Sequence, residues 1–173
     1  VACESNPIVG VRSFGVSTDV VTRHVVAAVK GLQNAGIGAC VKHFPGHGAV
    51  LEDSHHDLPR IKSTFSDYES HHIRPFIEAI KSSVSMVMLG HLIVESLDSN
   101  LPASLSPKLI KEYLRGTLGF NGLVVTDALD MGAIGGPTKI HESALKALVA
   151  GADLLCFSGM GDQSQFVVSS LER

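Results

Sequence analysis

Cysteine is scarce in this sequence, and its three copies, Cys3, Cys40 and Cys156, show no paired spacing. An odd count without a CxxC motif indicates neither a disulfide framework nor a cysteine-ligated metal site. Cys40 and Cys156 lie within apolar, strand-like runs, where a free cysteine is usually buried and inert. We therefore expect two buried, unreactive thiols, and the cysteines leave the cellular compartment open.

Long apolar runs and an excess of positive charge are also missing. No stretch approaches the ~18 apolar residues of a membrane helix, and no charged and then apolar leader opens the chain. The 14 Lys and Arg residues are outnumbered by 17 Asp and Glu residues, and no basic stripe alternates with aromatic residues. These absences argue against a nucleic acid or a membrane surface as the partner, so we expect a small molecule.

Apolar residues are plentiful enough for a core, because they make up 45% of the 173 residues. This length predicts a single domain. The sequence starts at Val1 in a turn-like segment and stops at Arg173 within a helical-looking stretch. We therefore expect residues 1–173 to be a fragment of a larger catalytic domain.

Helical and strand-like segments alternate along the sequence, which is typical of an α/β fold with parallel strands and crossover helices. Apolar residues at helical spacing predict a first helix from Thr18 to about Ala35. Its inward face is expected at Val21, Val25, Ala28, Val29 and Leu32. Ser66 and Glu69 have the spacing of a capping box and predict the start of a second helix.

Two further helices and four strands complete the pattern. Ser106 and Pro107 predict the start of a third helix, and its inward face is expected at Leu109, Ile110, Tyr113 and Leu114. The fourth helix is predicted over IHESALKALVA, and the strands over GACVKHF, VSMVMLG, LVVTD and DLLCF. Because these strands are short and apolar, we expect both faces of their sheet to be covered.

Three of the four predicted strands run into ionisable residues, namely His43, His91 and Asp127, while the last ends at Phe157. Catalytic groups of a (β/α)8 barrel lie at the carboxyl ends of its strands, and an open doubly wound sheet places its ligand there too. A full barrel needs ~250 residues, so this chain can supply only about half of one.

The segment Lys42–Pro59, KHFPGHGAVLEDSHHDLP, collects four histidines and two aspartates. Its spacing matches neither HExxH nor the His-x-His of metal-dependent barrel hydrolases, so we expect no metal and no other cofactor. As acid/base machinery, Asp53 can hydrogen-bond one nitrogen of His55 and raise the imidazole pKa, which leaves the other nitrogen for a substrate. A surface loop that merely holds histidines is the alternative.

Asp127 closes the strand LVVTD, and a carboxylate at the end of a buried strand is costly unless it has hydrogen-bond donors or a role. A turn or helix-capping aspartate is the alternative, which suits Asp130 better. Arg12, in VGVRSFG, and Lys42 could hold an oxygen-rich ligand, although such residues more often form salt bridges.

Five segments, in order, resemble the bacterial β-N-acetylglucosaminidase (β-hexosaminidase) branch of glycoside hydrolase family 3: NPIVGVRSFG, KHFPGHGxxxxDSHxxLP, LPASLS, LGFNGLVVTDALDMGAI and ALVAGADLL. The resemblance implies a TIM-type (β/α)8 barrel, of which this chain holds the central and later strand-helix units. It also implies a partner, a glycan that contains N-acetylglucosamine, from which a terminal β-linked sugar is removed with retention. Peptidoglycan recycling in a bacterial cytoplasm is slightly preferred over secretion.

The resemblance assigns roles to individual residues. Asp127 matches the nucleophile, His55 the general acid/base, and Asp53 the partner that orients His55. In this scheme a histidine replaces the acidic carboxyl group of most retaining glycosidases. Residues that bind the sugar hydroxyls are matched by Arg12, Lys42 and His43.

The sequence departs from the family in two places. Ala2 stands where the family usually has an aspartate before its NP turn, and the family's first strands, with an acidic sugar-binding motif, are missing. We therefore predict that this chain alone is weakly active or inactive. The alternatives are another family 3 glycosidase, a β-N-acetylglucosaminide phosphorylase, an inactive carbohydrate-binding remnant and a metal-dependent hydrolase.

Overall fold

The computed structural model describes residues 1–2, 9–50, 58–159 and 168–169. Its strands are β1 (Cys40–Phe44), β2 (Arg60–Ile61), β3 (Met86–Leu89), β4 (Ile93–Val94), β5 (Leu123–Ala128) and β6 (Leu154–Cys156). Its longer helical segments are α1 (Thr18–Asn34), α2 (Phe65–Tyr68), η3 (Glu69–Ile73), α3 (Arg74–Lys81), η5 (Lys108–Thr117) and α4 (Ile140–Ala150). Short helical turns are η1 (Gly10–Arg12), η2 (His47–Ala49), η4 (Ala103–Leu105), η6 (Gly132–Ile134) and η7 (Gly136–Lys139).

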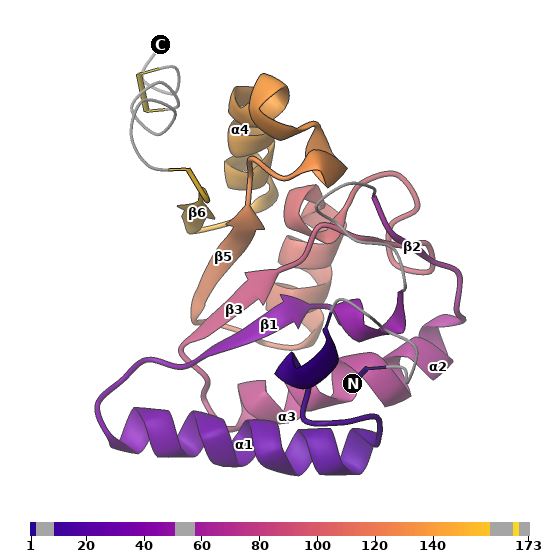
Figure 1. Cartoon of the computed structure of the whole chain (residues 1–173), viewed down its shortest axis with the longest axis vertical. Coiled ribbons are helices and arrows are strands. Elements are labelled where there is room, and N and C mark those ends of the chain that lie inside the picture. The colour runs from indigo at the N-terminus through magenta and orange to yellow at the C-terminus, as the bar shows by residue number, and fades with distance from the viewer. Residues whose placement is uncertain (3–8, 51–57, 160–167, 170–173) are drawn as a thin grey trace.

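The main sheet has four strands in the order β1-β3-β5-β6, and every neighbouring pair is parallel. The strands follow one another across the sheet in chain order, with helices between them (Figure 1). Consecutive parallel strands joined by helices are what part of a (β/α)8 barrel contains, so the predicted α/β class and partial barrel are confirmed. A separate pair, β2 and β4, was not predicted.

The predicted helices form, but one begins differently. The fourth helix has the predicted bounds, and the third is capped by Ser106, whose Oγ accepts a hydrogen bond from Leu109 N at 3.1 Å. The second helix starts earlier, because Thr64 Oγ1 accepts from Asp67 N at 3.3 Å. Glu69 instead accepts a hydrogen bond from a tyrosine hydroxyl of η5, so the predicted capping box is wrong.

Helices cover one face of the main sheet, and the other face is partly open (Figure 1). Along β3, Val87 and Leu89 are fully buried, whereas the alternate residues are only partly buried. Leu123 and Leu154 remain 46% and 44% exposed. The expectation of a sheet covered on both faces is therefore wrong for the described residues.

The two edge strands of this sheet carry the two described cysteines. Cys40 in β1 is exposed, and Cys156 in β6 is partly exposed. Within the described ranges, no strand pairs with the outer side of β1 or of β6. The predicted burial of both thiols is wrong for this reason.

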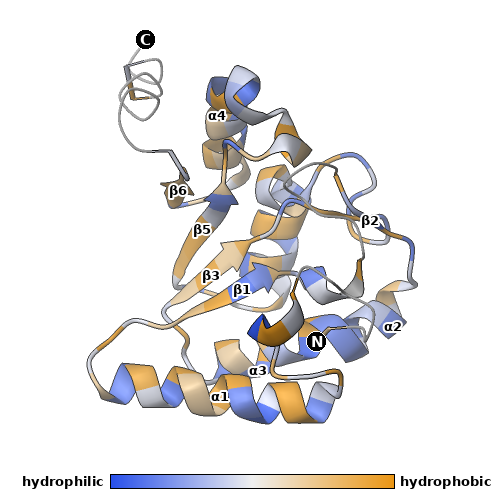
Figure 2. Cartoon of the chain, viewed as in Figure 1, coloured by the Kyte–Doolittle hydropathy of each residue, from blue (hydrophilic) through white to orange (hydrophobic). Residues whose placement is uncertain are grey.

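α1 buries only part of the face predicted for it. Val21 and Val29 are buried, but Leu32 is 45% exposed. These residues form an apolar wall of a pocket that is also lined by residues of β1 and α3. Apolar strands at the centre and alternating apolar and polar bands along α1 are visible in Figure 2.

Candidate active site

Asp127 and His43 meet at the carboxyl edge of the main sheet. Nε2 of His43, in β1, lies 3.5 Å from Oδ2 of Asp127, in β5, and the side chains are 16% and 21% exposed. Strand β3 separates β1 from β5, and it is followed by Gly90. A Cβ at Gly90 would lie only 3.1 Å from the Cβ of His43, so the missing side chain leaves room for the pair.

The Asp127 carboxylate has two different oxygen atoms. Oδ1 accepts a hydrogen bond from Ala128 N at 2.9 Å, while Oδ2 faces His43. The residue is only partly buried. A carboxylate with one anchored oxygen and one accessible oxygen can act as a nucleophile or as a hydrogen-bond acceptor.

Burial lowers the pKa of His43 to about 4, and the negative charge of Asp127 opposes this shift without cancelling it. Positive charge on Lys42, His47 and Arg12 lowers it further. The imidazole is therefore neutral near pH 7. A neutral ring at 3.5 Å from a carboxylate is beyond ordinary hydrogen-bond distance, so its nitrogen remains available to a ligand hydroxyl.

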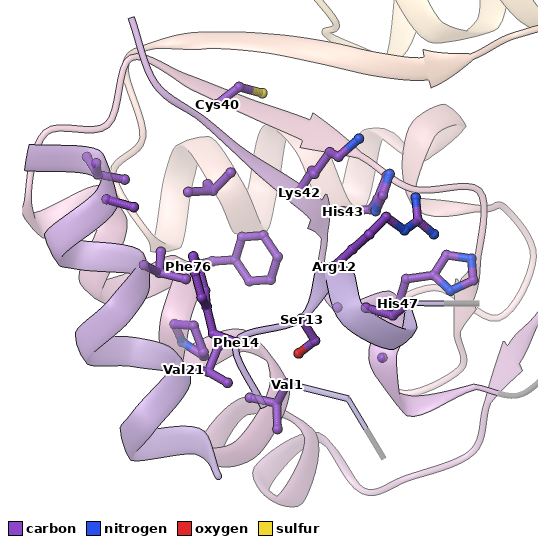
Figure 3. Close-up of a pocket in the computed structure, with 18 of the residues that line it drawn as sticks. Val1, Arg12, Ser13, Phe14, Val21, Cys40, Lys42, His43, His47 and Phe76 are labelled. Carbon is purple, nitrogen blue, oxygen red and sulfur yellow. The ribbon is translucent and has the colours of Figure 1, made fainter. Parts of the chain in front are cut away.

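Four nitrogen-bearing side chains gather at one end of a pocket, as Figure 3 shows. Arg12 comes from η1, Lys42 and His43 come from β1, and His47 comes from η2. The His43 and His47 rings are 6.1 Å apart in an edge-on arrangement. Together these groups give the carboxyl end of β1 a local excess of hydrogen-bond donors, which suits an oxygen-rich ligand.

The turn after β1 is held by contacts with the second helix. Tyr68, which is 1% exposed, donates a hydrogen bond from its hydroxyl to Gly46 O at 2.9 Å. Gly46 has φ +135°, and a Cβ at this position would lie 3.0 Å from the Cβ of His72. The ring of Phe44 packs edge-on against Phe76, with centroids 5.3 Å apart. The segment that presents His43 and His47 is thus tied to the core.

The structure brings together only some of the predicted site residues. Asp127 lies beside His43, while Arg12, Lys42 and His43 line one pocket. Asp53 and His55 lie outside the described residues, as do the neighbouring His56 and Asp57. The proton-transfer pair and all the assigned roles therefore stay predictions.

The sequence pattern predicts no role for His91, although this residue follows a predicted strand. His91 is fully buried and contacts Ser104 Oγ through Nδ1 at 2.7 Å and Ala128 O through Nε2 at 2.9 Å. Its position at a buried strand end was the available signal. These contacts place it directly behind the residue that follows Asp127.

Asp130 lies in the turn after β5, as the turn interpretation predicted, and it caps none of the described helices. Its Oδ1 accepts a hydrogen bond from Ser158 N at 2.9 Å, and its Oδ2 accepts from the Ser158 hydroxyl. Partial burial acts to raise the pKa of Asp130, but these hydrogen bonds outweigh it and lower the pKa. The aspartate therefore joins the loop after β5 to the end of β6.

Within the part of the chain that the structure describes, every helix is too short or too polar to cross a membrane. The same residues contain no group of three histidine, cysteine, aspartate or glutamate side chains arranged to hold a metal ion. Much of the histidine-rich segment falls outside these ranges, so the expected absence of a metal stays a prediction.

Comparison with known proteins gives consistent matches over nearly the whole chain. The family described as glycosyl hydrolase family 3 N terminal domain matches residues 1–169. A beta-hexosaminidase of Nitrosomonas eutropha is 34% identical over 170 residues, which are 98% of this chain and 49% of the relative. A beta-hexosaminidase of Chromobacterium violaceum is 32% identical over 164 residues, 95% of this chain and 46% of the relative.

Solved structures agree with these matches. A glycoside hydrolase family 3 β-N-acetylglucosaminidase from Paenibacillus sp. is 42% identical with a TM-score of 0.91, over 96% of this chain and 32% of the other. NagZ from Neisseria gonorrhoeae, in complex with N-trifluoroacetyl-D-glucosamine, is 32% identical with a TM-score of 0.83, over 98% of this chain and 48% of the other. The chain thus spans half or less of the length of these proteins.

Proposed function

The chain belongs to glycosyl hydrolase family 3, and on this basis we propose that it forms part of a retaining β-N-acetylglucosaminidase. The main support is the position of the Asp127 carboxylate at the carboxyl end of a buried strand. One of its oxygens is held by a hydrogen bond, and the other faces His43. Relatives named beta-hexosaminidase support the sugar class. The proposed substrates are peptidoglycan or chitin fragments with a terminal β-linked N-acetylglucosamine.

Asp127 is the proposed nucleophile. Its accessible oxygen attacks the anomeric carbon while the bond from that carbon to the leaving oxygen breaks, which forms a covalent glycosyl ester. The hydrogen bond from Ala128 N holds the other oxygen and directs the attacking one. A second displacement, in which water attacks the same carbon and releases Asp127, restores the starting configuration.

His55 is the proposed general acid/base, with Asp53 as its partner. In the first step the imidazolium gives its proton to the leaving oxygen, and in the second step the neutral ring takes a proton from water. Asp53 stabilises the charged form and orients the ring. One group with a pKa near neutrality suits both steps.

Arg12, Lys42 and His43 are the proposed sugar-binding residues. They line one end of the same pocket, and His43 is also adjacent to Asp127. Burial keeps the His43 imidazole neutral, so one nitrogen can donate a hydrogen bond and the other can accept one. This arrangement supports a role in fixing a hydroxyl group close to the reacting carbon.

This function is tested by measuring turnover of an aryl β-N-acetylglucosaminide by the full-length polypeptide, meaning the whole protein to which residues 1–173 belong. We expect aryl alcohol release without added phosphate, and a loss of kcat of about 10³-fold or more in Asp127→Asn, because the amide is a poor nucleophile. Asp153→Asn is the matched control, since Asp153 lies at the opposite end of the sheet, where it accepts from Val124 N at 2.7 Å. It should keep kcat within a few-fold.

Two results would contradict the proposal. A rate that requires phosphate would identify a phosphorylase, because phosphate would then accept the glycosyl group. Sugar binding by calorimetry without any turnover would identify a carbohydrate-binding protein.

A further inference from the structure

His91 is a fully buried histidine whose two ring nitrogens both have partners. Nδ1 lies 2.7 Å from Ser104 Oγ, and Nε2 lies 2.9 Å from Ala128 O. Ser104 comes from a loop 13 residues later in the chain, and Ala128 comes from the end of β5, 37 residues later. The ring therefore joins three separate segments behind the site.

The two partners determine which nitrogen carries hydrogen. A backbone carbonyl can only accept, so Nε2 must donate to Ala128 O. In the neutral ring Nδ1 then accepts the hydroxyl hydrogen of Ser104. Burial lowers the pKa of His91, which favours this neutral form.

Ser104 is itself held firmly. It is 0% exposed and lies in η4, where Ala103 N donates to Leu92 O at 2.8 Å and Leu105 N donates to Pro102 O at 2.8 Å. This loop is closed by a hydrogen bond of 2.6 Å from the Ser106 hydroxyl to Asp98 Oδ2. The serine therefore has little freedom to follow a moving ring.

Ala128 links this ring to the proposed nucleophile. Its N–H donates to Asp127 Oδ1 at 2.9 Å, while its carbonyl accepts from His91 Nε2 and from Met131 N at 3.2 Å. The residue that anchors the carboxylate is thus fixed by a side chain from the end of β3. A small shift in the position of a reacting group is enough to slow a substitution reaction strongly.

We propose that His91 and Ser104 are positioning residues, which hold Ala128 and thereby direct the free oxygen of Asp127 toward the anomeric carbon. This inference rests on the proposed function of Asp127. Neither residue touches the substrate. Their effect should therefore appear in kcat and leave the Michaelis constant almost unchanged.

The kinetic test uses the full-length polypeptide and an aryl β-N-acetylglucosaminide. We expect His91→Leu to lower kcat about 10- to 100-fold with KM within about two-fold, because the carbonyl loses its side-chain donor. His91→Gln should recover part of this loss, since its amide N–H can reach the same carbonyl. Ser104→Ala should give a smaller fall in kcat.

Ser143→Ala is the matched control. Ser143 is also buried, at 3% exposure, and its hydroxyl donates to a backbone carbonyl, Ile134 O, at 3.3 Å. Removing this hydroxyl should leave kcat unchanged. Wild-type kcat in a folded His91→Leu protein would overturn the positioning role. So would a fall in kcat in Ser143→Ala as large as the fall in Ser104→Ala.

Nuclear magnetic resonance separates this inference from the proposed function. Imidazole nitrogen shifts should show the Nε2–H tautomer of His91, and the carboxyl carbon of Asp127 should shift in Ser104→Ala but not in Ser143→Ala. An Nδ1–H tautomer or an unmoved Asp127 resonance would refute the inference even if the wild-type protein shows no turnover. Absent turnover with the expected spectra would refute only the proposed function.

Discussion

At the scale of single residues, the candidate site pairs two neighbouring side chains that differ in burial and in hydrogen bonding. Asp127 keeps one oxygen on a backbone N–H and one facing His43. The His43 side chain is somewhat more buried than that of Asp127, and its pKa is lowered, chiefly by burial. The pair therefore joins a partly exposed carboxyl group to a neutral ring, and this arrangement supports the proposed attack on a sugar held by hydrogen bonds.

The lowered pKa of His43 predicts a pH dependence of folding. Because its folded pKa of about 4 lies below the usual 6.5, the unfolded chain binds more protons between these values. The stability contribution of the neutral ring is complete above pH 6.5 and is lost as pH falls toward 4. His72, whose pKa is also lowered to about 4 by burial, acts in the same direction.

Urea unfolding at several pH values measures this dependence. The free energy of unfolding should fall as the pH is lowered through this window, and the fall should be smaller in His43→Asn, which removes one of the imidazoles whose pKa is lowered by burial. A nuclear magnetic resonance titration of His43 with a midpoint near 6.5 would contradict the account.

The residue types at the strand ends predicted ionisable side chains at the carboxyl edge of the sheet, but not that Asp127 and His43 form a pair there. The role of His91 could not be predicted, because its partners are a serine and a backbone carbonyl far along the chain. The exposure of Cys40 could not be predicted either, since an apolar run does not show whether its strand lies at an edge.

At the scale of elements, periodicity predicted the helices better than their ends. The third helix buries the four residues predicted for its inward face, Leu109, Ile110, Tyr113 and Leu114. The fourth has the predicted bounds, although Leu145, Leu148 and Val149 are exposed. The start of the second helix differs, because Thr64 and Ser66 are both acceptable caps and only the folded loop decides between them. Short pairs such as β2 and β4 carry too few residues for a periodic signal.

The turn after β1 gives a test at this scale. Gly46→Ala should cost about 1–3 kcal/mol of unfolding free energy, because the backbone conformation disfavours a side chain and the new Cβ meets His72. Gly31→Ala is the control, since Gly31 lies within α1 with open space around it. That substitution should stabilise the protein by up to about 1 kcal/mol. Equal effects of the two substitutions in denaturant unfolding would contradict the assigned role of Gly46.

At the scale of the whole molecule, four parallel strands with helices on one side make up about half of a (β/α)8 barrel. The other face of the sheet keeps exposed apolar residues, including Leu123 and Leu154. The relatives are at least twice as long as the region matched. We propose that the intact protein contains further strands that complete the sugar pocket, and the weak activity expected of residues 1–173 alone stays a prediction.

Asp127 is proposed to form a covalent bond to the sugar, and this bond can be detected directly. Incubating the full-length polypeptide with a 5-fluoro N-acetylglucosaminide that carries a good leaving group should trap this intermediate. The fluorine slows both steps, and the good leaving group keeps formation of the intermediate faster than its hydrolysis. Peptide mapping by mass spectrometry should then place the glycosyl mass on Asp127, with no label in Asp127→Asn. A label on any other residue would rule out Asp127 as the nucleophile.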